Sequence, residues 1–344
     1  MHAAVVESFG QPLVITSLPE PEPARDEVVV RVERVAVNRT LDVEVHQSGA
    51  GWGVAPPLVT GADPAGIIEE VGSDVTQFNP GDRVAVFPFL FDGHCPWCQR
   101  GQHSACDQFG VLGVHRLGGD AQRLCIPARN CFRLPDTVSF DHAAAASLTY
   151  GVAVELLIRR AQIKAGETIL IWGGAGGVGS AAIDISQGLG ARIIAVGSSP
   201  ERLAFCRELG ADETINRRTD AVAEAIGDMT HGRGVDVVLE NIGQDSWQTS
   251  LGALGREGRL VTSGVVTGAQ AAIDIRALYR KHVGLWFSAG FGLPVFSSVI
   301  EGLASGRYHP AVTKVARLAE ADQAQSLIVS NHAMGRILLD PQAR

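Results

Sequence analysis

The sequence lacks two features that would each point to a particular kind of partner. It has no excess of positive charge, because 29 Lys and Arg stand against 37 Asp and Glu, and a formal net charge of −8 is the wrong sign for binding nucleic acid. It also has no long hydrophobic run, since the most apolar window, residues 142–158, is interrupted by Ser147, Thr149 and Glu155. We therefore expect neither nucleic acid nor a membrane among its partners.

Cysteine is scarce, and the chain opens without the pattern of a secretory leader. Six cysteines in 344 residues, three of them between positions 95 and 106, favour metal ligands in a reducing compartment over a disulfide framework. Residues 1–10 include Glu7 and contain no basic stretch followed by an apolar core, which a secretory signal would have. We expect a cytoplasmic protein whose mature chain starts at Met1.

Glycine is abundant, with 40 residues, and the patterns around it change along the chain. Residues 1–135 alternate polar and apolar positions between turn signals, as in 27–37, and predict a compact antiparallel β-barrel. From Thr168 onward strands and helices alternate, with strands at 168–172, 192–196, 235–239 and 259–262, which predicts a parallel sheet with helices on both faces. A helix from Ser139 toward Arg160 connects the two patterns.

The predicted fold class is therefore α/β plus β, with two domains, as the length of 344 residues allows. Residues 1–140 form the β-barrel domain and residues 141–290 form the doubly wound parallel-sheet domain. Residues 291–344 return to the first domain, with a helix at 294–305 and a strand at 336–339.

A glycine-rich loop follows the strand predicted at 168–172. The pattern G-x-G-x-x-G begins at Gly174 and leads into a helix that extends to Leu189. Glycines in this context permit a tight turn and a close backbone approach to a pyrophosphate, and the N-terminus of the helix offers N–H groups to the anion. A glycine-rich turn without a ligand is the alternative. The predicted cofactor contacts are Gly174, Gly176, Gly177, Val178 and Gly179.

The end of the second strand of this domain indicates which nicotinamide cofactor binds. An NAD site usually places a carboxylate there to hold the ribose 2′-hydroxyl, whereas residues 197–200 are small or carry hydroxyl groups and Arg202 follows. A second cation, Arg217, comes directly after the short strand 213–216. We predict NADP(H), with the 2′-phosphate held by Ser198, Ser199, Arg202 and Arg217.

Four potential metal ligands lie close together in the first domain. Asp92, Cys95, Cys98 and Cys106 follow the spacing D-x2-C-x2-C-x7-C, which allows a loop to fold around one tetrahedral Zn²⁺. A site closed by four protein ligands is structural, because no position is left for a substrate. His94 or His103 in place of Asp92, or a lobe that has lost its metal, are the alternatives. We predict one structural Zn²⁺ per chain.

These motifs resemble the medium-chain dehydrogenase/reductase superfamily, which includes zinc alcohol dehydrogenases and quinone oxidoreductases, over essentially the whole chain. Residues 61–72 are similar to its segment G-H-E-x-x-G-x-V and residues 80–84 to its P-G-D-x-V turn. Residues 92–106 resemble its structural zinc lobe with Asp in place of the first Cys, and 118–121 resemble its G-G-x-A turn.

The resemblance implies a GroES-like β-barrel catalytic domain and a Rossmann domain. It also implies that Thr149 lies near the nicotinamide ribose, and Asn241, after the strand 235–239, joins the predicted cofactor contacts. A homodimer or homotetramer, assembled through the edges of the Rossmann sheets, is what the family leads us to expect.

The chain departs from the zinc alcohol dehydrogenases at their catalytic metal. The family's ligands are a Cys after the second strand, the His of G-H-E, and a Cys or acid before the linking helix. Here these places are filled by Asn38, by Ala62 and by the alanine run around Ala145, and Asp63 alone cannot build a three-ligand site. We therefore predict a reaction centre without a metal.

Residues 38–43 instead resemble the N-x-x-D stretch of quinone oxidoreductases, with one extra residue before Asp42. Hydride transfer to the β-carbon of an α,β-unsaturated carbonyl produces an enolate, which is less basic than an alkoxide and can be stabilised by neutral donors. We predict NADPH-dependent reduction of an activated C=C bond or a quinone, with Asn38, Tyr150 and Asp42 as catalytic residues.

Two other functions remain open at this point. A metal-free NADPH-dependent reductase of ketones or aldehydes would act on the carbonyl group of an enone rather than on its C=C bond. A non-catalytic NADPH-binding protein would bind the nucleotide without oxidising it. In either enzymatic case the partner is a small carbonyl compound, enone or quinone.

Overall fold

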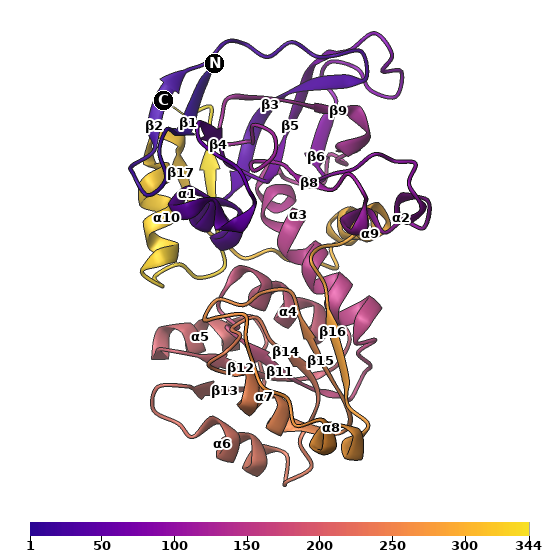
Figure 1. Cartoon of the computed structure of the whole chain (residues 1–344), viewed down its shortest axis with the longest axis vertical. Helices are drawn as coiled ribbons and strands as arrows, with labels where there is room; N and C mark the ends of the chain where they lie inside the picture. Colours follow the sequence, from indigo (N-terminus) through magenta and orange to yellow (C-terminus); the bar gives the residue numbers. More distant parts are fainter. Residues whose placement is uncertain (344) are drawn as a thin grey trace. The chain divides into compact units, whose positions relative to one another are not determined.

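The computed structural model describes residues 1–343 and divides the chain into two compact units (Figure 1). Unit 1 comprises residues 1–148 and the chain from Gly292 onward, and unit 2 comprises Thr149–Phe291. The first boundary lies inside helix α3 (Phe140–Val154), at 148/149 rather than at the predicted 140/141. Because the helix continues across this boundary, the change of sequence pattern marks where the helix begins and not where unit 1 ends.

Unit 1 consists mainly of β-strands. Its strands are β1 (His2–Val6), β2 (Val14–Ser17), β3 (Glu27–Ala36), β4 (Leu58–Val59), β5 (Asp63–Val71), β6 (Arg83–Val86), β7 (Phe89–Leu90), β8 (Gly110–Val111), β9 (Arg123–Pro127), β10 (Cys131–Arg133), β17 (Val312–Arg317) and β18 (Arg336–Asp340). One sheet has the order β10-β6-β5-β3-β18-β17, with β9 also paired to β3. A second has the order β2-β1-β4, and β7 pairs with β8. The pair β17–β18 is parallel, and β18 pairs antiparallel with β3, so the returning chain joins the main sheet.

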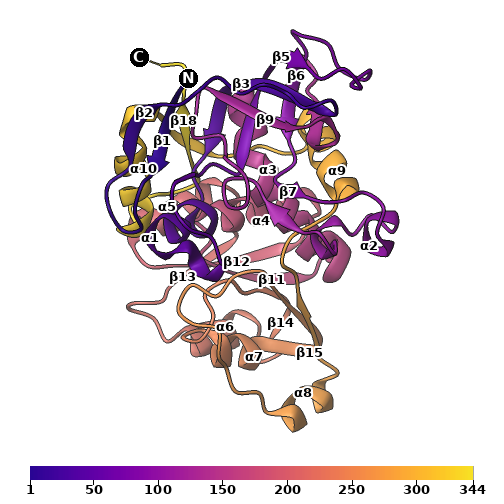
Figure 2. The same ribbon diagram turned by 45° about the horizontal axis from the view of Figure 1, so that its top comes forward.

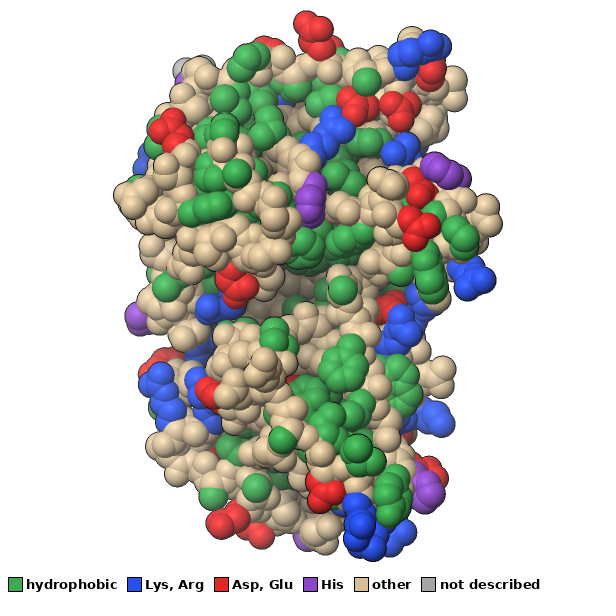
Figure 3. Space-filling view, viewed as in Figure 1, with side chains coloured by type: hydrophobic (Ala, Val, Ile, Leu, Met, Phe, Trp, Pro, Cys, Tyr) green, Lys and Arg blue, Asp and Glu red, His purple; other side chains and the backbone are tan. Residues whose placement is uncertain are grey.

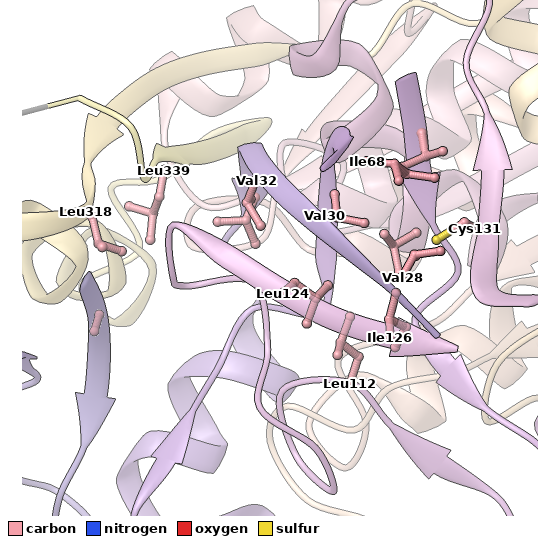
Figure 4. Packing of buried hydrophobic residues seen from close by; sticks show 14 of the residues in the cluster. Val28, Val30, Val32, Ile68, Leu112, Leu124, Ile126, Cys131, Leu318 and Leu339 are labelled. Carbon is pink, nitrogen blue, oxygen red and sulfur yellow. The ribbon is translucent and has the colours of Figure 1, made fainter. Parts of the chain in front are cut away.

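Strand β3 crosses the core of unit 1. Val28, Val30 and Val32 alternate along it with 0% exposure, and Val28 and Val30 lie opposite Ile126 and Leu124 of β9. Figure 4 shows these side chains packed in one cluster that extends to β18. The burial fixes the register of β3, and a slip of one residue would expose the valines. The register therefore also fixes where the strand ends, next to the first candidate site residue.

Besides the first part of α3, the described residues of unit 1 contain four α-helices of four to twelve residues. They are α1 (Val45–Ser48), α2 (Pro96–Gln99), α9 (Leu293–Ala304) and α10 (Ala321–Val329), with a π-helix at Arg39–Glu44. Within residues 1–343, no helix has the length and hydrophobicity needed to cross a membrane.

Unit 2 contains a six-stranded sheet whose strands are all parallel. Its strands are β11 (Thr168–Trp172), β12 (Arg192–Gly197), β13 (Glu213–Asn216), β14 (Val235–Leu239), β15 (Leu254–Thr262) and β16 (Gly284–Phe287), and its helices are α4 (Gly177–Gly188), α5 (Pro200–Glu208), α6 (Val222–Met229), α7 (Trp247–Ala253) and α8 (Ile275–Lys281). The order is β13-β12-β11-β14-β15-β16, and all of these strands except β16 are labelled in Figure 2. From β11 the chain adds strands first on one side of the sheet (β12, β13) and then on the other (β14, β15, β16). The point between β11 and β14 is therefore the topological switch point, where doubly wound sheets bind ligands at the carboxyl ends of their strands.

The predicted fold class is confirmed, and several strands of unit 2 have the predicted bounds. Strands β11 and β14 occupy 168–172 and 235–239 as expected, because each is a buried apolar run between turn residues. Strand β16 was not predicted, since its four residues, GLWF, show no alternation. Strand β15 starts at Leu254, five positions before the predicted start at 259.

Candidate functional site

The glycine loop of unit 2 joins β11 to α4 in a conformation that requires glycine. A Cβ at Gly179 would overlap the carbonyl oxygen of Gly173, and one at Gly174 would lie 2.9 Å from the Cys206 Sγ. The loop therefore packs against its own first residue and against α5. No larger residue fits at these two positions without moving the backbone.

The N-terminus of α4 is arranged as an anion-binding site. Gly176 is the N-cap residue and provides no side-chain cap to the first N–H groups of the helix. Those groups belong to Gly177, Val178 and Gly179, at the positive end of a twelve-residue helix. An uncapped helix N-terminus that follows a buried parallel strand suits a dinucleotide pyrophosphate, so the residues present fit this cofactor.

The ends of β12 and β13 bring the predicted 2′-phosphate residues to one edge of the sheet. The backbone N–H of Arg217 donates to the Gly197 carbonyl at 3.0 Å, so the residue after β13 lies beside the last residue of β12. Ser199 is the N-cap of α5, and its hydroxyl accepts the Arg202 N–H at 3.4 Å. The Ser199 hydroxyl also lowers the pKa of the neighbouring Glu201 carboxyl. Two arginines and one carboxylate thus lie close to this strand end.

The loop after β14 depends on a buried carboxylate that the sequence analysis missed. Glu240 is 0% exposed, and its Oε1 accepts the N–H groups of Ile242 and Gly243 at 2.6 and 3.0 Å and the Ser246 hydroxyl at 3.0 Å. The next residue, Asn241, accepts the N–H of Ser263 through its side-chain oxygen at 3.0 Å. Glu240 thereby fixes the loop that presents Asn241. An acid directly after an apolar strand was the available signal.

Tyr150, a predicted catalytic residue, forms a side-chain hydrogen bond within unit 2. It is 2% exposed, and its hydroxyl donates to the Asp184 carboxylate of α4 at 2.7 Å. Its neighbour Thr149 is 3% exposed. The hydroxyl proton is therefore already used, and this geometry favours a role for Tyr150 in joining α3 to α4 over donation to a substrate.

Asn38, the second predicted catalytic residue, lies at the centre of a buried polar network in unit 1. Its Nδ2 donates to the Asp63 Oδ2 and to the Ala36 carbonyl, each at 3.2 Å, and its Oδ1 accepts from Arg336 Nη1 at 3.0 Å. Arg336 Nη2 completes the triangle with the Asp63 Oδ2 at 3.0 Å. All three residues are at most 5% exposed. Arg336 comes from β18, and no sequence motif pointed to it.

Asp42, the third predicted catalytic residue, positions the backbone around Asn38. Its Oδ2 accepts the backbone N–H of Asn38, and its Oδ1 accepts that of Gly61 at 2.8 Å. Residues Arg39–Glu44 between Asn38 and the next helix form a π-helix, in which the Val43 N–H donates to the Asn38 carbonyl. A π-helical turn holds one residue more than an α-helical turn, so it accommodates the extra residue before Asp42.

Two buried carboxyl groups, those of Asp42 and Asp63, interact with the Arg336 guanidinium, and a third, that of Asp120, interacts with Asp42. Burial raises the pKa of Asp42 to about 6 and that of Asp63 to about 7, although the Arg336 cation opposes the shift at both. Burial also raises the pKa of Asp120, which accepts the Thr60 hydroxyl at 2.7 Å, to about 8. The cluster therefore retains protons near neutral pH, and Asp120 was another residue that the sequence analysis missed.

The positions at which the resemblance places catalytic zinc ligands carry no usable ligand set. Ala62 and Ala145 are both 0% exposed and offer only methyl groups, and the Asn38 amide is engaged by Arg336 and Asp63. Among residues 1–343, the one cluster of three or more His, Cys, Asp or Glu side chains with metal-site geometry lies elsewhere, in the lobe 92–106.

That cluster consists of Asp92, Cys95, Cys98 and Cys106, whose ligand atoms lie within 4.8 Å of one another. The Cys95 and Cys106 sulfurs are 3.9 Å apart, and a tetrahedral Zn²⁺ with Zn–S bonds of about 2.3 Å separates its sulfurs by about 3.8 Å. The N–H groups of Cys95 and His94 donate to the Asp92 Oδ1 and lower the pKa of this carboxyl, which leaves Oδ2 available to a metal. The residues present therefore fit zinc, and neither His94 nor His103 belongs to the cluster.

Two models of protein families match parts of the chain. Residues 24–136 match the model of the alcohol dehydrogenase GroES-like domain, and residues 177–305 match that of the zinc-binding dehydrogenases. The chain belongs to the medium-chain dehydrogenase/reductase superfamily and is an oxidoreductase of that superfamily.

Its relatives have several activities. An alcohol dehydrogenase of Geobacillus stearothermophilus is 32% identical over 77% of this chain and 78% of the relative. An acryloyl-coenzyme A reductase of Metallosphaera sedula is 28% identical over 98% of this chain and 99% of the relative, and a quinone oxidoreductase of Pseudomonas aeruginosa is 30% identical over 93% of each. The crystal structure of an NAD-dependent alcohol dehydrogenase covers 99% of both chains with a TM-score of 0.92 at 30% identity.

Proposed function

We propose that the protein reduces an activated C=C bond, or a quinone, with NADPH and without a catalytic metal. The observation that carries this proposal is the residue set Asn38, Ala62 and Ala145, which stands where the resemblance places the catalytic zinc ligands and offers no thiolate, imidazole or carboxylate to Zn²⁺. The names of the acryloyl-coenzyme A reductase and quinone oxidoreductase relatives support the choice of substrate class.

The proposed reaction needs stabilisation of an enolate oxygen. Bound NADPH would supply a hydride to the β-carbon, the C=C electron pair would move toward the carbonyl oxygen, and the enolate would then take a proton from water at its α-carbon. In our proposal the Asn38 amide donates a hydrogen bond to the enolate oxygen. Its two present hydrogen bonds are long, at 3.2 Å, and an enolate is a stronger acceptor than the Ala36 carbonyl, so the enolate would replace that carbonyl as the partner of one hydrogen. Arg336 polarises this amide by donating to its oxygen. Asp42 holds the Asn38 backbone, and Tyr150 is a positioning residue.

The choice of NADPH rests on the strand end at Gly197. The residues there, Ser198, Ser199, Arg202 and Arg217, offer hydroxyl groups and two cations to a 2′-phosphate. One of the related structures, a crotonyl-CoA carboxylase/reductase, is in complex with NADP, at 25% identity and a TM-score of 0.90. Arg217→Gln should raise the Kd for NADPH about tenfold and leave that for NADH unchanged, because a charge-assisted hydrogen bond contributes about 1.5 kcal/mol. An NADH Kd equal to or below the NADPH Kd of the wild type would overturn the cofactor choice.

The function is tested by supplying an enone with NADPH and identifying the bond that disappears. The proposal expects the saturated ketone, and an allylic alcohol would favour the carbonyl reductase instead. NADPH binding without oxidation across quinones, enones and aldehydes would favour the non-catalytic protein. Asn38→Ala should lower kcat at least tenfold without changing the Kd for NADPH, whereas Asn79→Ala, in an exposed turn, should change neither.

We also propose one structural Zn²⁺ per chain in the lobe 92–106. Its role would be to tie this loop together without contacting the substrate. Metal analysis of protein purified without chelator should find about one equivalent of zinc per chain, and less than about half an equivalent would contradict the proposal.

A homodimer formed through the outer edge of β16 is our proposal for the assembly. Large apolar side chains are exposed on α8 and β16, including Ile275 at 73%, Tyr279 at 61% and Phe287 at 62%. Figure 3 shows hydrophobic side chains gathered over this part of unit 2. Light scattering should report a dimer, and Phe287→Asp should dissociate it, whereas Val329→Asp, at an exposed position of unit 1, should not.

A further inference from the structure

The histidine between the second and third cysteines of the metal cluster contacts a distant segment of the same unit. His103 is 7% exposed, and its Nδ1 accepts the backbone N–H of Leu293 at 3.2 Å. Leu293 is the first residue of α9, whose N-cap, Gly292, provides no side chain to satisfy that N–H. His103 is therefore the capping group of this helix, supplied from 190 residues away in the sequence.

The contact coincides with the point at which the chain re-enters unit 1. Unit 2 ends at Phe291, and unit 1 resumes at Gly292. A Cβ at Gly292 would overlap the Gly101 carbonyl oxygen, and a Cβ at Gly101 would lie 3.0 Å from the Pro294 side chain. The backbone at Gly101, two residues before His103, is thus in close contact with the segment that begins α9.

Aromatic packing holds the His103 ring in the orientation that the cap requires. Its centroid lies 4.5 Å from that of Phe91 and 6.2 Å from that of Phe87, both in edge arrangements. Phe87 also packs edge-on against Phe296 of α9 at 5.5 Å. Two members of the metal cluster, Cys98 and Cys106, flank His103 in the sequence.

We propose that His103 is a positioning residue through which the metal lobe orders the re-entry segment, residues 291–293. Metal bound by Asp92 and the three cysteines would hold the short loop 99–105 at both ends and keep Nδ1 on the Leu293 N–H. Without the metal the loop loses this anchorage, the cap is lost, and the first turn of α9 frays. The inference rests on the proposed zinc but not on the proposed reaction, so that either can fail without the other.

The test is hydrogen–deuterium exchange measured by mass spectrometry on the full-length protein, following peptides that cover residues 289–297. Removing the metal with a chelator should speed exchange in these peptides about two- to tenfold, the range expected for loss of one capping hydrogen bond, and leave β14 unchanged. His103→Ala should produce the same local change while zinc content stays at the wild-type level. His103→Asn, whose amide retains an acceptor near the position of Nδ1, should restore slow exchange.

His94→Ala is the matched control, because His94 lies in the same lobe but its side chain is 84% exposed. It should leave exchange at 289–297 unchanged. Unchanged exchange in His103→Ala would overturn the proposed role of His103. Fast exchange that persists in His103→Asn would overturn the capping hydrogen bond, because it would show that His103 acts only through the packing of its ring. Unchanged exchange after chelation of a zinc-containing protein, or on adding zinc to a zinc-free one, would overturn the coupling to the metal. The chelation experiment uses the wild type, so it remains informative if a variant does not fold.

Discussion

Replacing Asp120 with asparagine should change how the stability of the protein depends on pH. Asp120 is 2% exposed, and its carboxyl accepts the Thr60 hydroxyl at 2.7 Å. Burial raises its pKa to about 8, and the nearby Asp42 carboxylate adds to the shift. Asparagine has nearly the same shape and retains an oxygen for Thr60, but it cannot ionise. The substitution therefore removes one titration with little change in packing.

The sign and size of the effect follow from proton linkage. An unfolded aspartate has a pKa of about 3.9, so between about pH 4 and pH 8 folded Asp120 holds a proton that the unfolded chain has released. Its contribution to stability is complete below about pH 4 and is lost as the pH rises toward 8, at up to about 1.4 kcal/mol per pH unit. From about pH 5 to pH 7 this amounts to about 3 kcal/mol at most.

The measurement is urea unfolding of the wild type and Asp120→Asn at several pH values in this range, followed by tryptophan fluorescence. The free energy of unfolding of the variant should fall less steeply with pH, and the two curves should converge at low pH. Asp136→Asn, which changes a side chain that is 99% exposed, serves as the control and should run parallel to the wild type. A variant curve parallel to that of the wild type would show that Asp120 does not carry the proton assigned to it.

Three further substitutions test other parts of the structure. Arg336→Met should destabilise the protein by about 3 to 5 kcal/mol, because it leaves Asp63 buried without its cation, and urea unfolding near neutral pH measures this. Gly179→Ala should abolish NADPH binding in a fluorescence titration, since the new Cβ would overlap the Gly173 carbonyl oxygen. The matched Gly188→Ala, with no atom within 4 Å of the new Cβ, should bind normally. Asp92→Ala should lower the zinc retained after dialysis against a chelator, whereas Asp92→Cys should retain at least as much as the wild type.

The sequence was most informative where structure depends on neighbouring residues. The glycine loop, the strands at 168–172 and 235–239 and the spacing of the cysteines are local patterns, and each appears in the structure at the predicted place. The strand end at Gly197 and the residue after β13 also lie together as parallel pairing requires.

The sequence was least informative where partners come from distant segments. Asn38 and Tyr150 were predicted as donors on their chemistry alone, without the partners that the fold gives them. The Tyr150 hydroxyl donates to Asp184 at 2.7 Å, which makes it a positioning residue, whereas the Asn38 amide makes only the long contacts to Asp63 and Ala36. These pairings follow from strand register and helix packing, which no local pattern encodes. Arg336 was missed for the same reason, since an arginine at the start of a short strand shows no sign of being buried.

The triangle of Asn38, Asp63 and Arg336 also has a consequence for synthesis on the ribosome. Asp63 and its cation are 273 residues apart, and all of unit 2 is translated between them. At a translation rate of about 5 to 20 residues per second, Arg336 is synthesised roughly 15 to 55 seconds after Asp63. During that time Asp63 lacks the guanidinium with which it pairs in the folded protein. Unit 1 therefore completes its folding only after the whole of unit 2 has been synthesised.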